Sequence, residues 1–153
     1  AEETLAHELT IALQFASVGT LVSLKSPRLR GGVTPAVIVE KCDGPGQFPL
    51  LLCLTLDNVW MLLPCQGVVS LHAELSCLQV DGVKLPDLNR SGELRHGDQD
   101  SGRLALAVAH MARRHDMTTA QYDLAGEVLS QVHLVQELED HLEGLQLFML
   151  VSL

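Results

Sequence analysis

Four basic residues are the side chains in this sequence most suited to binding a polyanion. Lys25, Arg28 and Arg30 lie in the segment 25–32 (Lys-Ser-Pro-Arg-Leu-Arg-Gly-Gly), called the basic loop below, and Lys41 is an outer member of the group. Flexible cations beside a Gly-Gly turn can approach phosphate oxygens closely. The pattern predicts a nucleic-acid-binding site at these four residues, and an ordinary solvated loop is the competing interpretation.

This positive charge is local, because the chain as a whole is acidic. The formal net charge is -9 over 153 residues, and residues 118–145 hold six acidic residues with no Lys or Arg. A globally acidic protein repels nucleic acid at long range, so we expect any contact to be confined to the basic loop. Trp60 and Phe48 are expected in the core, which favours phosphate contact over base stacking.

Short strands are predicted to position the basic loop. Dense apolar or β-branched runs occupy residues 18–24, 33–40, 50–56 and 60–71, and Gly, Pro, Asp or Asn bounds each run. Asp57 and Asn58 predict a two-residue hairpin connection, since both tolerate a positive φ, and Trp60 would supply the largest apolar surface. The pattern predicts a small antiparallel β-barrel over residues 18–80.

Helices are predicted on both sides of this barrel, which makes the fold class α+β. Residues 1–17 form the N-terminal helix, with its apolar stripe between Glu2 and Phe15, and residues 81–100 form a polar loop. Two further helices are predicted in residues 101–145, followed by an apolar tail at 146–153. The first of these runs over 101–114. The second opens at a Thr118–Gln121 capping box, and its apolar stripe continues to Gly144.

Metal, cofactor and membrane chemistry are not indicated. The four cysteines (Cys42, Cys53, Cys65 and Cys77) lack the close spacing of zinc or redox motifs, and they are predicted to be buried thiols, with a disulfide pair left open. No segment reaches the roughly 18 apolar residues of a membrane span. No export signal is evident, so we expect a cytoplasmic protein, and the Ala at position 1 suggests a piece of a longer chain.

A stand-alone enzyme is the third class of function to weigh. Two pairs, Asp116 with His115 and Ser101 with His96, are sequence neighbours in polar segments, whereas catalysis needs groups that converge from separate elements. Caps and solvated charges explain them better. The chain also lacks a Gly-x-x-x-x-Gly-Lys-Ser/Thr loop and an Asp-Glu-x-His segment, so no catalytic residue and no ATP hydrolysis are predicted.

Four segments in this order resemble a known family. They are Gly19–Leu24, Leu54–Trp60, Glu93–Asp98 and Met117–Leu124. They are similar to the region that follows the helicase core in cyanobacterial and chloroplast DExH-box RNA helicases, relatives of the superkiller and exosome-associated helicases. The resemblance covers most of residues 1–143.

The resemblance implies an accessory role beside the helicase core of a parent chain. In such helicases an arch, made of a helical stalk and a KOW-type barrel, contacts structured RNA and receives adaptor peptides. The barrel predicted here would then be KOW-like, and the flanking helices would be part of the stalk. The alternative is a protein-interaction module that binds an adaptor peptide at a barrel edge and makes no RNA contact. A homodimer through exposed helical stripes is a further expected partner arrangement.

Overall fold

The computed structural model describes residues 2–29 and 32–117, with side chains described from residue 7 onward. The chain divides into two compact units. The first contains helix α1 (Glu2–Phe15), which matches the predicted apolar stripe and lies within the predicted range 1–17. The second, Ala16–Ala120, contains the sheet, helix α2 and every described residue of the predicted site.

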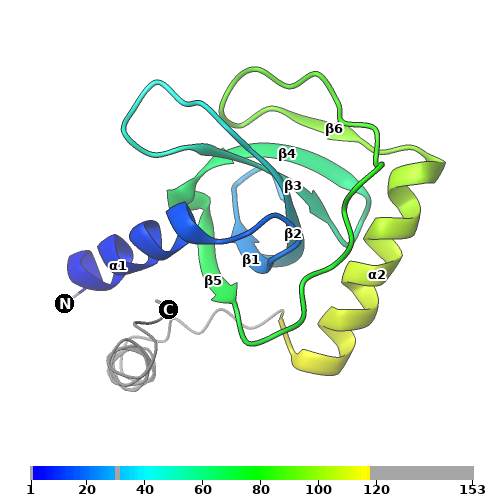
Figure 1. The fold of residues 1–153 in the computed structure, drawn as a ribbon, viewed down its shortest axis with the longest axis horizontal. Helices are drawn as coiled ribbons and strands as arrows, with labels where there is room; N and C mark the ends of the chain where they lie inside the picture. Colours follow the sequence, from blue (N-terminus) through cyan, green and yellow to red (C-terminus); the bar gives the residue numbers. More distant parts are fainter. Residues whose placement is uncertain (1, 30–31, 118–153) are drawn as a thin grey trace. The chain divides into compact units, whose positions relative to one another are not determined.

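Within its described part, the second unit is built on a six-stranded antiparallel sheet (Figure 1). The strand order is β5-β1-β2-β3-β4-β6. The strands are β1 (Leu21–Lys25), β2 (Val33–Cys42), β3 (Leu50–Thr55), β4 (Val59–Pro64), β5 (Val68–His72) and β6 (Leu94–His96). The predicted α+β class is therefore confirmed.

The sheet is strongly curled but open, so the predicted closed barrel is wrong. Only the three-residue 3-10 turn η1 (Cys65–Gly67) joins β4 to β5, although β3, β2 and β1 lie between them in the sheet. Four strand spacings span about 19 Å in a flat sheet, and a 3-10 turn advances only about 2 Å per residue, so the sheet must curl. The sheet does not close because β6 pairs with the outer edge of β4, which β5 would otherwise occupy.

Two strand predictions differ from the structure for local reasons. The run 60–71 forms two strands rather than one, because η1 begins directly after Pro64 and separates β4 from β5. The predicted polar loop contains the short strand β6, which the pairing with β4 holds in place. The hairpin loop between β3 and β4 has three residues, Leu56, Asp57 and Asn58, and of these only Asn58 has a positive φ, at 61°.

The central strands β2, β3 and β4 are buried on both faces of the sheet, which explains their nearly continuous apolar runs. Leu54 and Trp60 are cross-strand partners, and they belong to the core cluster that also contains the buried residues of α2. Cys53 and Met61 are the next pair along and lie on the opposite face, because successive side chains alternate. All six residues of β3 are buried. Trp60 is 3% exposed, as predicted for the core.

Helix α2 (Gln99–His115) packs against β2 and β3 and lies beside the sheet in Figure 1. Its buried stripe consists of Leu104, Ala105, Val108 and Ala112. The helix begins two residues before the predicted start because Asp98 caps it: the Asp98 carboxylate accepts from the Ser101 amide at 2.9 Å. The Ser101 hydroxyl accepts in return from the Asp98 amide at 2.9 Å, which completes a capping box.

The third predicted helix, its Thr118–Gln121 capping box and the apolar tail lie outside the described residues. The helical stalk and the homodimer that depend on them therefore stay predictions.

Candidate nucleic-acid interface

The structure places three of the four predicted cations, and these three lie in two separate places. Lys25 ends β1, Arg28 follows in the basic loop, and both side chains are exposed. Lys41 lies near the other end of β2, eight residues beyond Val33, which is the cross-strand partner of Lys25. That separation is about 27 Å along an extended strand. Arg30 lies outside the described residues.

Lys41 also differs from Lys25 and Arg28 in its environment. Its side chain is half-buried, and burial lowers the pKa of its ammonium group, while the nearby Cys65 thiol acts in the opposite direction. Partial burial limits how closely a large polyanion can approach this charge. Lys41 therefore belongs to a different part of the surface from Lys25 and Arg28.

Arg28 is held in place by a segment far away in the sequence. Its Nη1 atom donates to the Gly92 carbonyl oxygen at 2.6 Å. Within the basic loop, Ser26 shapes the turn, because its hydroxyl accepts from the Arg28 amide at 3.3 Å and its carbonyl accepts from the Leu29 amide at 3.0 Å. A guanidinium carries five N–H donors, so the bond to Gly92 leaves most of them available for an anion.

The segment that carries Gly92 is a β-bulge on the edge of β4. The Gly92 amide donates to the Leu62 carbonyl at 2.7 Å, and the Leu62 amide donates to the Glu93 carbonyl at 3.0 Å, so two residues oppose one. Gly92 has φ +89°, a conformation in which glycine carries no steric penalty. A bulge of this kind bends the strand and changes the direction of the side chains beside it.

Glu93 fixes the turn that precedes the bulge. Its Oε1 atom accepts from the Asn89 amide at 2.9 Å and from the Arg90 amide at 2.6 Å. These two backbone bonds, with smaller contributions from the Arg90 and Arg95 charges, hold the pKa of Glu93 below its usual value. The carboxylate is therefore stabilised in its ionised form at the base of the turn.

The basic loop and the bulge segment form an open pocket of about 430 Å³. It is lined by Arg28, Arg90, Ser91, Glu93 and Leu94. The first three of these side chains are exposed. Arg90 is not predictable as a site residue from the sequence, because no local pattern distinguishes it within a polar segment. Only the fold brings it into the same pocket as Arg28.

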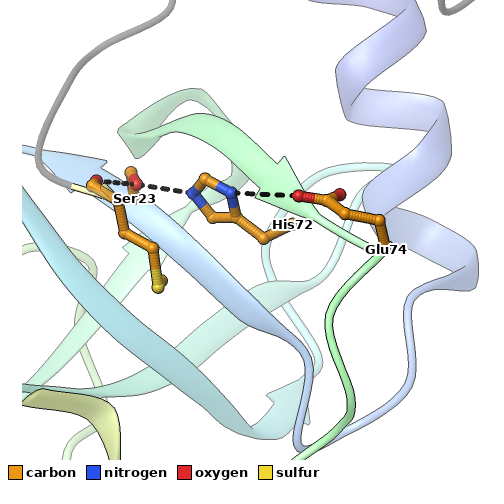
Figure 2. Close-up of polar contacts among 4 residues, drawn as sticks. Ser23, His72 and Glu74 are labelled. Carbon is orange, nitrogen blue, oxygen red and sulfur yellow. Dashed lines mark hydrogen bonds and ion pairs between the residues drawn. The ribbon is translucent and has the colours of Figure 1, made fainter. Parts of the chain in front are cut away.

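A second polar cluster lies on β1 and β5 and contains the residue types of a hydrolase triad (Figure 2). The Ser23 hydroxyl is 2.8 Å from His72 Nε2, and His72 Nδ1 is 3.7 Å from Glu74 Oε1. The Ser23 hydroxyl also donates to the Met117 carbonyl at 2.5 Å. The hydrogen bond to His72, with lesser help from the His72 and His115 charges, keeps the pKa of Glu74 below its usual value.

The direction of the protons shows that this cluster is structural. A serine hydroxyl has one hydrogen, which goes to Met117, so His72 Nε2 must donate to Ser23. A nucleophilic serine requires the reverse, with the imidazole nitrogen accepting the hydroxyl proton. Ser23 is also fully buried and His72 is 6% exposed. The cluster therefore links β1 and β5 to Met117, two residues beyond the end of α2.

In each of the other two pairs considered for catalysis, one residue caps helix α2. Ser101 belongs to the capping box of α2, and Asp116 is its C-cap residue with φ 50°. His96 is exposed on β6, where it pairs with Val59 of β4.

The Asn58 turn, which carries part of the family resemblance, anchors the start of α2. Asn58 Nδ2 donates to the Asp98 carbonyl at 2.9 Å, Asn58 Oδ1 accepts from the Ser101 hydroxyl at 2.6 Å, and the Asn58 carbonyl accepts from the Gly97 amide at 2.7 Å. A Cβ atom at Gly97 would overlap Asn58 Oδ1 and Ser101 Oγ. Position 97 therefore requires glycine. The Asn58 turn connects the β3–β4 hairpin to the start of helix α2 through hydrogen bonds.

The described ranges show neither a metal cluster nor a membrane helix. No group of three or more His, Cys, Asp or Glu side chains gathers within residues 2–29 and 32–117. Among the helices of the same ranges, none combines the length and the apolar character needed to cross a bilayer.

All four cysteines are free thiols. Cys53 and Cys65 are buried, as predicted. Cys42 is half-buried and Cys77 is exposed, so the prediction of a buried thiol is wrong for Cys77.

Fold and site together define a small α+β domain with exposed cations at Lys25, Arg28 and Arg90. Residues 11–115 match the family model described as the cyanobacterial Ski2-like RNA helicase, middle domain. The match spans more than half of the chain, which therefore belongs to this family, and the resemblance read from the sequence is confirmed. No curated protein matches the chain, and no solved structure matches it.

Proposed function

We propose that this domain is a non-catalytic accessory part of a Ski2-like RNA helicase that contacts the RNA backbone. The contact is made by Lys25, Arg28 and Arg30 of the basic loop. The observation that carries the proposal is Arg28: its exposed guanidinium is fixed by the Gly92 carbonyl and keeps donors for a phosphate.

The accessory role is supported by what the sequence lacks. The chain has no phosphate-cradling Gly-x-x-x-x-Gly-Lys-Ser/Thr loop and no Asp-Glu-x-His segment. ATP hydrolysis would belong to the helicase core of the parent chain. The present domain would then act as an arch that holds a cationic loop against RNA bound by that core.

Charge and aromatic placement favour phosphate contact over base recognition. The net charge of -9 opposes RNA at long range, so binding depends on the few cations of one surface. Trp60 is buried in the core and offers no stacking face. We propose that RNA is bound through its backbone and shape, and that Lys41 does not share the contact made by the basic loop.

The test is a salt titration of RNA binding by the purified chain, followed by fluorescence anisotropy of a short labelled hairpin RNA. Three phosphate contacts predict a slope of log K against log salt of about -2 to -3 between about 50 and about 200 mM salt. Arg28→Ala should weaken binding several-fold and reduce the magnitude of the slope by roughly 0.7 to 0.9. Lys41→Ala is the matched control and should leave both unchanged.

Absence of binding at low salt, or equal effects of Arg28→Ala and Lys41→Ala, would contradict the proposal. Absence of binding would leave the adaptor-peptide role as the function to pursue. That role is checked by the same anisotropy assay with a labelled peptide.

A further inference from the structure

We propose that the pocket between Arg28 and Arg90 is a site for a single RNA backbone phosphate, with Arg90 and Ser91 forming its second half. This inference rests on the proposed function and deepens it. It adds Arg90 and Ser91, which lie about sixty positions away from the basic loop in the sequence. The proposed phosphate site is then a pocket lined by two segments and not the basic loop alone.

The two arginines that line the pocket come from segments far apart in the sequence. Arg28 comes from the loop after β1, and Arg90 comes from the turn before β6. Both guanidinium groups are exposed and line the same space of about 430 Å³, together with the Ser91 hydroxyl. Two planar guanidinium groups and a hydroxyl are donors that match the oxygens of a phosphate.

The pocket is organised before any ligand arrives. The bulge at Gly92 and Glu93 is anchored to Leu62 by two backbone hydrogen bonds, and the Gly92 carbonyl holds Arg28. The Glu93 carboxylate bridges two amides of the Arg90 turn. Residues on both walls therefore have fixed backbones, which reduces the entropy lost on binding.

Glu93 has a second effect, which makes the proposal sharply testable. Its negative charge lines the pocket together with the two positive charges of Arg28 and Arg90, so the lining is net positive by one charge. The carboxylate thus holds the turn and at the same time opposes an anion. Glu93→Gln keeps an Oε1 acceptor for both amides and removes only the charge.

The experiment compares Arg90→Ala, Glu93→Gln and the double variant Arg28→Ala with Arg90→Ala in the hairpin-RNA anisotropy assay. Arg90→Ala should weaken binding several-fold, whereas Glu93→Gln should tighten it. Because one phosphate is shared, the double variant should reduce the magnitude of the salt slope by only about 0.7 to 0.9, not by about twice that value. Arg113→Ala, in the last turn of α2 and outside the pocket lining, is the control and should have no effect.

Opposite signs for Arg90→Ala and Glu93→Gln cannot arise from loss of folding, which would weaken binding in both. The inference is overturned if Arg90→Ala behaves like Arg113→Ala, if Glu93→Gln weakens binding, or if the double variant loses twice the slope. In those cases Arg28→Ala alone would still weaken binding and the proposed function would stand. If the unsubstituted chain fails to bind RNA, the proposed function fails as well, and the two failures are thereby distinguished.

Discussion

The Ser23–His72–Glu74 cluster and the Arg28–Arg90 pocket differ in how their donors are used. In the first, the Ser23 hydroxyl and His72 are buried and each donates within the fold. In the second, both arginine side chains are exposed, and the hydrogen bond from Arg28 to the Gly92 carbonyl uses one of its five N–H donors. The cluster that resembles an active site uses its donors within the fold, and the arginine pocket keeps exposed donors.

The comparison teaches that residue types alone do not define a site. A serine, a histidine and a carboxylate in a row are catalytic only when the imidazole accepts the hydroxyl proton and a substrate can reach the oxygen. Basic side chains can bind an anionic ligand when the fold positions them and some of their N–H donors make no bond within the protein. Substitutions in the two clusters should therefore change different properties of the protein.

The largest effect on stability is expected for Ser23→Ala. The change leaves the buried Met117 carbonyl without its donor and His72 Nε2 without its acceptor. At about 1 to 3 kcal/mol for each of these two unsatisfied buried groups, the free energy of unfolding should fall by about 2 to 6 kcal/mol. Urea unfolding followed by the fluorescence of Trp60, the single tryptophan of the sequence, measures this change.

Ser70→Ala is the matched control for that experiment. Ser70 is the cross-strand partner of Ser23 and is also buried, but its hydroxyl has no hydrogen-bond partner within the described residues. Its replacement should change stability by less than about 0.5 kcal/mol. Equal losses in the free energy of unfolding for Ser23→Ala and Ser70→Ala would show that the Ser23 hydrogen bonds do not stabilise the fold. A loss of RNA affinity in folded Ser23→Ala would contradict the purely structural role of the Ser23 cluster.

A smaller loss of stability is expected for Asn58→Ala. The Asn58 turn is partly exposed, as the arginine pocket is, but its hydrogen bonds are made within the fold. The variant loses the bonds to Asp98 and Ser101 and places an alanine at φ 61°, so we expect a loss of about 2 to 3 kcal/mol. Asn58→Gly removes the same bonds without the backbone penalty and should lose about 1 kcal/mol.

Amide hydrogen exchange in the first turn of α2 is the second readout for both Asn58 variants. Exchange should accelerate there in each variant, because Asn58 anchors Asp98 and Ser101. Unchanged exchange, or equal losses of stability for alanine and glycine, would show that the turn does not hold the helix as described.

Local patterns predicted the elements of this fold better than their assembly. Trp60 in the core, Asn58 at a turn and α2 follow from apolar spacing and turn chemistry, which act over a few residues. The closed barrel was wrong because β6, a three-residue strand in a polar segment, takes the edge of β4. Its pairing is a long-range contact that no local pattern indicates.

The same reason explains what was missed in the candidate site. The basic loop stands out in an acidic sequence, so Lys25 and Arg28 could be predicted as candidates. Arg90 joins them only through the bulge at Gly92 and the bond from Arg28 to its carbonyl, 64 positions away. Conversely, Lys41 is near the basic loop in sequence but at the other end of β2 in space.

The most direct test of the account is a titration of the isotope-labelled chain with hairpin RNA, followed by backbone amide chemical shifts. The account predicts salt-sensitive shifts in residues 25–29 and 89–94, with the amides of Ser23, His72 and Met117 unchanged. Shifts confined to β5, to α2 or to the Ser23 cluster, with residues 25–29 and 89–94 unaffected, would contradict it.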